Sequence, residues 1–163
     1  MSSDWSSDVC SSDLVHVKEL DENTCLLMKK AGFKSIRMGL ETADFSQSRT
    51  MDAKVAKTDF SRAVSGLKKA GFEGKQIGAY LLCGLPGQEF AEIEASFRQV
   101  SQTGITPTPA FYTPLPHTRM WETAVKHARY DIETDPVYTN NCLFPCIPDP
   151  GFRQKISRLQ SRM

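Results

Sequence analysis

The sequence predicts an α/β protein in which parallel strands alternate with helices to form part of a β/α barrel. Short apolar runs alternate with amphipathic segments, and the pentapeptide Lys-Lys-Ala-Gly-Phe occurs twice, at 29–33 and 68–72. Such alternation favours parallel pairing through right-handed crossovers. A complete barrel needs about 250 residues, so a chain of 163 residues would supply roughly half of one. A complete doubly wound sheet is the alternative, but no Gly-x-Gly-x-x-Gly loop follows the first strand.

The individual elements follow from apolar spacing and from residues that end helices. Gly32 ends the first helix, because glycine readily takes the left-handed conformation found just beyond a helix. Apolar side chains at helical spacing mark the next two helices. The expected helices cover 21–31, 58–70 and 89–103, and the expected strands cover 35–41, 76–82 and the region near 110–113. Farther along, we expect a short helix at 122–129, turns at 145–150 and a basic segment with helical potential at 152–163.

Three parts are expected along the chain. Residues 1–14 repeat Ser-Ser-Asp and have no periodicity that could bury a face, which is typical of a disordered tail. The run 8–14 also resembles a sequencing adapter translated as codons, so we interpret 1–14 as an artefact or a tail. In the artefact interpretation, the true upstream sequence has been replaced and Cys10 has no function. The barrel part is expected at 15–130, and an irregular tail at 131–163.

Composition excludes several classes of partner. The net charge is +1, which gives no electrostatic reason to bind bulk nucleic acid or an anionic membrane. No apolar run approaches the ~20 residues that span a bilayer, and the N-terminus does not resemble a secretory signal. The five cysteines are irregularly spaced and do not suggest a disulfide framework. A cytoplasmic location is therefore predicted.

Candidate ligand-binding segments lie where the predicted strands end, because parallel α/β proteins bind ligands there. They are 39–42, 83–89 and 112–118. Glu41 can accept hydrogen bonds from hydroxyl or amino groups, although a helix-capping or ion-paired glutamate is an equally good interpretation. The glycines around Pro86 permit close approach of the backbone to a flat ligand, but they also form ordinary strand-to-helix turns. The prolines of the third segment stiffen a loop that would present Tyr112 and Thr113.

The order of these motifs resembles the radical S-adenosylmethionine (SAM) superfamily, in the branch with tRNA methylthiotransferases, oxygen-independent coproporphyrinogen oxidases and cobalamin-binding members. The resemblance covers roughly 15–141, and 135–141 resembles the segment after the barrel in several cobalamin-binding members. The matching motifs are Gly-Leu-Glu-Thr at 39–42, Lys-Val at 54–55, Leu-Lys-Lys-Ala-Gly-Phe at 67–72, Gly-Leu-Pro-Gly-Gln at 84–88 and Tyr-Thr-Pro-Leu-Pro-His-Thr at 112–118.

The resemblance implies half of a TIM-like radical SAM barrel and a small-molecule cofactor, SAM. In the parent protein, a [4Fe-4S] cluster would cleave SAM reductively to a 5′-deoxyadenosyl radical, and cobalamin is a possible further cofactor. Glu41 would face the ribose or methionine end of SAM, Leu82, Gly84 and Leu85 would contact adenine, and Thr113 and Pro114 would lie near adenosine or substrate. The implied cofactor-binding residues are therefore Gly39, Glu41, Leu82, Gly84, Leu85, Thr113 and Pro114. No catalytic residue and no metal ligand is predicted.

Two departures from the family pattern matter. The Cys-x-x-x-Cys-x-x-Cys motif that would hold the cluster is absent from the sequence. Cys25 and Cys83 are expected to be small buried hydrophobic residues, while Cys142 and Cys146 have only part of the spacing, which leaves an auxiliary metal site as a minor alternative. His117 stands where the family commonly has glycine, and we expect it to be exposed or hydrogen-bonded.

Three functional hypotheses follow. The first is a fragment of a radical SAM enzyme, inactive alone, whose partner is the missing N-terminal half of the barrel. The second is a non-catalytic α/β module that binds a partner through an exposed sheet edge. The third is a non-radical β/α-barrel lyase, which is disfavoured because Lys34 and Lys75 precede strands and so lie at the wrong end for a Schiff base.

Overall fold

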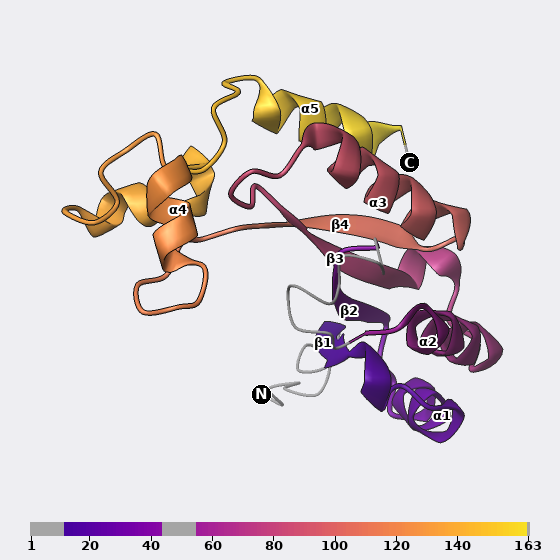
Figure 1. Cartoon of the computed structure of the whole chain (residues 1–163). Coiled ribbons are helices and arrows are strands. Elements are labelled where there is room, and N and C mark those ends of the chain that lie inside the picture. The colour runs from indigo at the N-terminus through magenta and orange to yellow at the C-terminus, as the bar shows by residue number, and fades with distance from the viewer. Residues whose placement is uncertain (1–11, 44–54, 163) are drawn as a thin grey trace, which may run out of the picture. The chain divides into compact units, whose positions relative to one another are not determined.

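The computed structural model describes residues 12–43 and 55–162 (Figure 1). The described residues form a sheet with strand order β1-β2-β3-β4, and β2 pairs in parallel with both β1 and β3. The strands are β1 (Ser12–His16), β2 (Ser35–Glu41), β3 (Ile77–Cys83) and β4 (Thr106–Phe111). The helices are α1 (Glu22–Lys30), α2 (Lys57–Lys69), α3 (Phe90–Gln102), α4 (Trp121–His127) and α5 (Phe152–Ser161). The predicted α/β class, with parallel strands and intervening helices, is confirmed.

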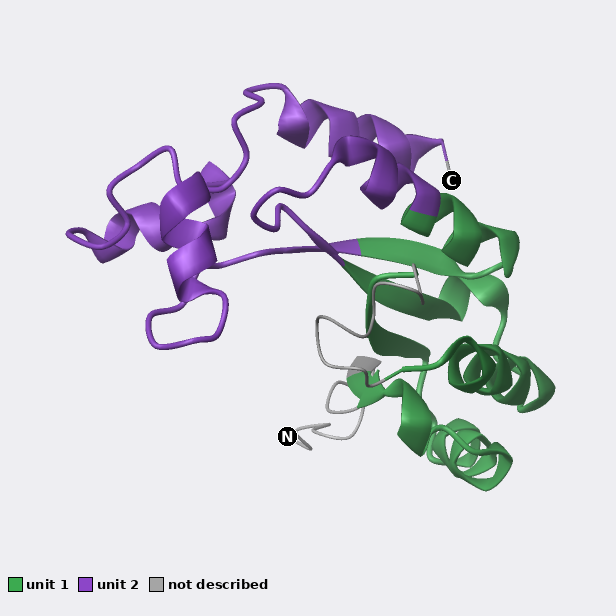
Figure 2. Ribbon diagram, in the orientation of Figure 1, with its two compact units in different colours: residues 1–81, 96–108 green, residues 82–95, 109–163 purple. Residues whose placement is uncertain are grey.

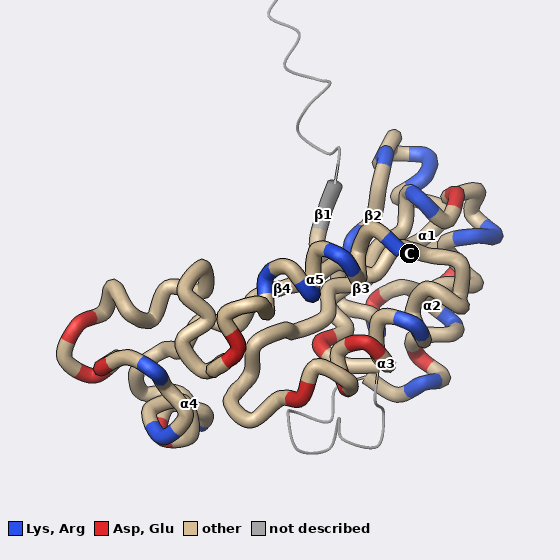
Figure 3. The backbone as a smooth tube through the Cα atoms, turned by 90° about the horizontal axis from the view of Figure 1, so that it is seen from above, with Lys and Arg blue, Asp and Glu red and all other residues tan. Residues whose placement is uncertain are grey.

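Two compact units make up the chain (Figure 2). Unit 1 comprises 1–81 and 96–108, and unit 2 comprises 82–95 and 109–163. Basic and acidic residues occur in both units (Figure 3), in line with the near-neutral net charge. No helix among the described residues is long and apolar enough to cross a membrane.

Most predicted elements are present with ends that differ by one or two residues. Strand β4 is the exception: it covers Thr106–Phe111, earlier than the strand expected near 110–113. Of the expected tail at 1–14, residues 1–11 lie outside the described residues, whereas Ser12–His16 forms β1 and pairs with β2. Lys54 of the Lys-Val pair also lies outside the described residues.

Both copies of the repeated pentapeptide end a helix in the same way. Gly32 and Gly71 have φ of 91° and 93°, in the left-handed region that favours glycine. After each glycine, the chain turns back on the helix: Phe33 N donates to Met28 O over 3.2 Å, and Phe72 N donates to Leu67 O over 3.1 Å. These bonds satisfy carbonyl groups that the ending helix would otherwise leave unpaired.

The core of unit 1 lies between its strands and α2. Alternate residues of β2 are buried, as a strand with one covered face requires. Helix α2 buries Phe60, Val64 and Leu67, which are spaced so that they share one face. Full burial of each such side chain contributes roughly 1.5–3 kcal/mol to folding. The parallel pairing of β2 with β3 holds the two strands side by side, so the ends of both strands are well defined.

Strand β4 has an outer edge that cannot support further strand pairing. Tyr112 N donates to Cys83 O over 2.9 Å, so the even-numbered residues of β4 direct their N–H groups toward β3. The odd-numbered positions that face outward include Pro107 and Pro109, which have no N–H to donate. The next outward carbonyl, of Phe111, accepts from Asn141 Nδ2 over 3.5 Å.

Unit 2 has two small apolar clusters of its own. The rings of Phe111 and Phe152 each pack edge-on against Phe144, with centroids 5.0 and 5.1 Å away. Helix α4 contributes Ala124 to a second cluster with Ile132 and Cys146, all buried. Together these clusters hold the segment after β4 in a defined conformation.

Candidate ligand site at the strand ends

Strand β2 ends in a strained turn centred on Glu41. Glu41 has φ of 65°, and Thr42 N donates to Leu40 O over 2.8 Å, which makes a three-residue turn. Turns of this kind with positive φ are rare, and a residue other than glycine held in such a conformation costs of order 1–3 kcal/mol. Backbone strain of this kind is concentrated at functional sites, so the observed geometry singles out Glu41 among the glutamates.

The surroundings leave the Glu41 carboxylate accessible. The side chain is exposed, and no described residue forms an ion pair with it. The register between β2 and β3 shifts between Gly39 and Glu41, where Glu41 stands beside Leu81. After the turn, Ala43 N donates to the buried Ser96 Oγ over 3.4 Å. The backbone is thus held on both sides of an exposed acceptor.

Gly39 itself is not required by close packing. It pairs with His16 and Tyr80 in the sheet, and a Cβ atom added there would meet only Leu14 Cδ1, at an ordinary 3.9 Å. The described structure therefore gives no steric reason for glycine at position 39.

Strand β3 ends in a turn that the side chain of Gln88 organises. Gln88 Oε1 accepts from Gly84 N over 2.8 Å and from Leu85 N over 3.2 Å, and Gln88 Nε2 donates to Leu82 O over 3.0 Å. One side chain thus satisfies three backbone groups of the turn. These are the backbone groups of the residues that we expected to contact adenine, so a ligand would have to use other atoms of the turn or displace Gln88.

One side of this turn is covered by the C-terminal segment of unit 2. Gly84 has φ of 92°, and a Cβ atom there would lie 3.8 Å from both Ile147 Cγ1 and Phe144 Cδ1. Leu85 is buried, with 8% of its surface exposed, whereas Leu82 is half-buried. Within unit 2, the side of Gly84 that faces Phe144 is therefore closed to a ligand.

The segment after β4 does not present Tyr112 as we expected. The Tyr112 ring packs on the cluster around Cys146, its hydroxyl is buried without a hydrogen-bond partner among the described residues, and burial raises its pKa. Pro114 is fully buried. Thr113 is half-buried and lines a cavity of about 370 Å³. Of Tyr112, Thr113 and Pro114, only Thr113 has an accessible polar group.

The cysteines do not form a metal centre in the described part of the chain, where no three His, Cys, Asp or Glu side chains come close enough to hold an ion. Cys25 and Cys83 are fully buried, as predicted. Burial raises the pKa of Cys83 to about 12 and that of Cys146 to about 11, which disfavours the thiolate form that ligates metals. Cys142 is exposed.

His117 has a left-handed backbone conformation. It has φ of 64° and an exposed side chain. The left-handed conformation at this position favours glycine, which is the residue that the related motif commonly has there. The predicted exposure of His117 is confirmed.

The candidate residues divide between the units. Gly39 and Glu41 belong to unit 1, and the other five belong to unit 2. Within unit 2, the bond from Tyr112 N to Cys83 O brings the Gly84 turn and Thr113 to the same end of neighbouring strands. Sequence reasoning missed Gln88 as the organiser of the turn. Its amide, four residues after Gly84, was the available signal.

Among solved structures, this chain is similar to coproporphyrinogen III oxidase (HemN) from Escherichia coli, a radical SAM enzyme. The TM-score is 0.58 at 15% sequence identity, and the match covers 90% of this chain and 30% of the HemN chain. This likeness establishes a shared fold, a partial match to a radical SAM barrel. The chain spans less than a third of the length of that structure. No family model matches the sequence, and no curated protein matches it.

Proposed function

We propose that this chain is part of a radical SAM enzyme, corresponding to the later β/α units of the barrel, and that it retains one side of the SAM site. The observation that carries the proposal is the fold match to a radical SAM enzyme over 90% of the chain. The ordered strand-end motifs at 39–42, 84–88 and 112–118 support it. A cobalamin requirement in the parent protein stays a prediction from the resemblance of 135–141.

The proposed role of each residue follows from its geometry. Glu41 offers an exposed carboxylate at the end of β2, where it can accept hydrogen bonds from ribose hydroxyls or from the amino group of SAM. Gln88 holds the Gly84 turn at the end of β3 in one conformation through its side-chain hydrogen bonds. Thr113 contributes a hydroxyl at the end of β4. Gly39, Leu82, Leu85 and Pro114 lie within a few positions of these three residues in the sequence.

The residues present do not fit a [4Fe-4S] cluster. Such clusters need several cysteine thiolates together, whereas in the described part of the chain no three Cys, His, Asp or Glu side chains come close enough to hold a metal. We therefore assign the cluster to the β/α units that precede this segment in the parent barrel, and we derive no catalytic step from this chain alone. SAM cleavage would belong to the assembled barrel.

The preceding half of the barrel would dock on β1 and α1. Leu14, Leu26 and Leu27 are 62%, 47% and 56% exposed, and all three belong to these two elements of unit 1. Exposed large apolar side chains favour an interaction surface on these elements. The edge of β4, in contrast, lacks the N–H groups of Pro107 and Pro109 and cannot accept a further strand.

Binding of SAM to the isolated chain tests the retained half-site. Isothermal titration or NMR should detect weak binding of SAM, and Glu41→Gln should weaken it about fivefold, the effect of losing one charge-assisted hydrogen bond. Glu19→Gln, which changes another exposed glutamate of unit 1, is the matched control. Equal SAM affinity in the wild-type chain and Glu41→Gln would remove Glu41 from the site.

Reconstitution tests the assignment of the cluster. Anaerobic treatment of this chain with iron and sulfide should give no [4Fe-4S] absorption. A SAM-cleaving cluster formed on this chain alone would overturn the proposal that the cluster belongs to the preceding units.

A further inference from the structure

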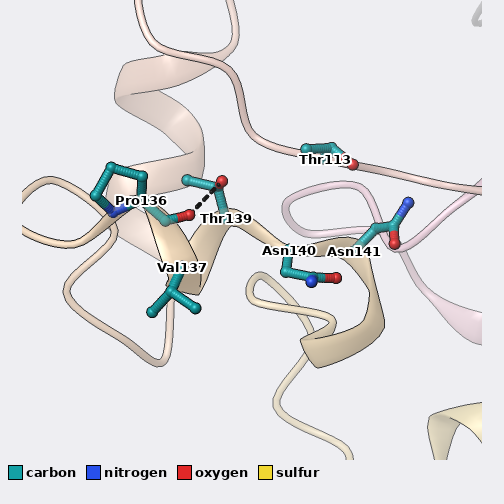
Figure 4. A pocket seen from close by; sticks show the side chains of 6 residues that line it. All are labelled: Thr113, Pro136, Val137, Thr139, Asn140 and Asn141. Atoms are coloured by element: carbon teal, nitrogen blue, oxygen red, sulfur yellow. Dashed lines mark hydrogen bonds between the residues drawn. The ribbon is translucent and has the colours of Figure 1, made fainter.

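Unit 2 contains a cavity that, apart from Thr113, is lined by residues with no role in the proposed SAM site. Its volume is about 370 Å³, within the range of small-molecule sites. Thr113 faces the loop that follows α4 across this cavity (Figure 4). The lining consists of Thr113, Pro136, Val137, Thr139, Asn140 and Asn141. None of these side chains carries a charge, so the cavity offers no counter-ion to an anionic ligand.

Several polar atoms of the lining are already used. Asn140 Oδ1 accepts from Cys142 N over 2.8 Å, and Thr139 Oγ1 donates to Pro136 O over 2.8 Å. Asn141 Nδ2 donates to Phe111 O over 3.5 Å. Three groups remain without a hydrogen-bond partner among the described residues: the Asn140 amide NH₂, Asn141 Oδ1 and the Thr113 hydroxyl. They provide a donor, an acceptor and a group that can act as either.

The loop that carries the two asparagines is held in place by its own contacts. Asp135 Oδ1 accepts from Val137 N over 2.9 Å at the start of the loop. The rings of Tyr130 and Tyr138 stack with centroids 5.3 Å apart. Arg129 Nη2 donates to Leu143 O over 3.0 Å at the end of the loop. Groups that are fixed before binding lose less entropy when a ligand arrives.

We propose that this cavity binds an uncharged planar group through an amide-type edge, meaning a hydrogen-bond donor beside an acceptor. The free Asn140 NH₂ and the free Asn141 Oδ1 together supply a donor and an acceptor, which are the two partners that such an edge needs. A primary carboxamide and a nucleobase both present this edge. A carboxylate of the same size presents only acceptors and a charge, which the uncharged lining does not compensate. The inference deepens the proposed function, because Thr113 belongs to both, but its test uses no SAM, so each can fail without the other.

The test compares nicotinamide with nicotinate. The two probes have nearly equal shape, but nicotinamide carries a carboxamide where nicotinate carries a carboxylate. In NMR titrations of the ¹⁵N-labelled chain, nicotinamide in the millimolar range should shift the side-chain amide signals of Asn140 and Asn141. Nicotinate should bind at least about tenfold more weakly. Adenosine is the second arm: a lower dissociation constant than that of nicotinamide identifies a nucleobase as the preferred source of the edge, and a higher one identifies a carboxamide.

Variants complete the test. Asn140→Asp removes the free NH₂ donor and keeps the Oδ1 that accepts from Cys142 N, so it should weaken nicotinamide binding about tenfold. Asn23→Asp makes the same change on exposed α1, in the other unit, and should have no effect. Thr113→Val removes a hydroxyl without a change of shape and covers the case in which Asn140→Asp disturbs the loop. Saturating nicotinate binding equal to that of nicotinamide would overturn the proposal, and so would unshifted Asn140 and Asn141 signals with every probe.

Discussion

The two copies of Lys-Lys-Ala-Gly-Phe have the same local structure but different surroundings. Gly32 and Gly71 have φ within two degrees of each other, 91° and 93°, and both phenylalanines return a hydrogen bond to their helix. Phe72 is nevertheless 3% exposed with the Lys29 ammonium 4.5 Å from its ring centroid, whereas Phe33 is only half-buried. The pentapeptide therefore specifies how the helix ends. Whether its phenylalanine is buried depends on which β/α unit carries the pentapeptide.

The largest difference between the copies should appear on truncation of the phenylalanines. Phe72→Ala should lower the free energy of unfolding by about 3 kcal/mol, because it removes a buried ring and leaves a cavity. Phe33→Ala should cost about 1 kcal/mol, because its ring is only partly buried and loses less apolar contact. Urea denaturation followed by circular dichroism measures both. Equal losses would mean that the two copies are buried alike.

The glycines should behave identically. Gly32→Ala and Gly71→Ala should each cost about 1–2 kcal/mol, the price of a left-handed conformation for an L-residue. Neither glycine has a neighbour that a Cβ atom would crowd: nothing lies within 4 Å at Gly32, and Lys29 Cε lies 3.7 Å away at Gly71. Thermal denaturation of the two variants side by side is the measurement. A clear difference between them would break the claim that local structure is the same.

The exposed leucines of α1 should matter for association more than for stability. Leu27→Lys should change the free energy of unfolding by less than about 0.5 kcal/mol and should reduce any concentration-dependent self-association seen by sedimentation velocity. Leu115→Lys is the matched control, because Leu115 is 56% exposed, as Leu27 is, but belongs to unit 2. If both variants reduced association equally, the surface of β1 and α1 would have no special role.

The smallest effect should come from the second lysine of each copy. Lys69 Nζ lies 2.6 Å from Glu22 Oε1, and both side chains are 67% exposed. Lys69→Met should therefore cost less than about 1 kcal/mol, and the loss should shrink in high salt. Lys30 occupies the same place in the first copy and forms no ion pair with the described residues, so Lys30→Met should have no salt-dependent effect. A larger loss for Lys30→Met would contradict this assignment.

The elements that sequence predicted well are those with strong local signals. The ends of α1 and α2 follow from glycine, and β2 and β3 follow from apolar runs. Strand β4 was misplaced because Pro107 and Pro109 argue against a strand, and only the pairing with β3 reveals that their missing N–H groups face outward. The outer edge of a sheet tolerates prolines, because no neighbouring strand needs their missing N–H groups, whereas an inner strand would not tolerate them.

The site was predictable in position but less so in detail. The ends of β2, β3 and β4 were the expected places for a ligand, and that follows from the parallel sheet. The burial of Tyr112 depends on residues more than ten positions away, such as Cys146, so no local pattern could indicate it. The same holds for Asn141, which reaches Phe111 O across 30 positions.

The two prolines of β4 also limit how large an assembly of this chain can become. Sheets that pair edge to edge can grow without limit only if both edges accept a neighbour. Two copies joined through β1 would turn only their β4 edges outward, and neither edge offers the donors that a third copy needs. Growth by strand addition would end at a pair, which protects a partial barrel from forming fibres.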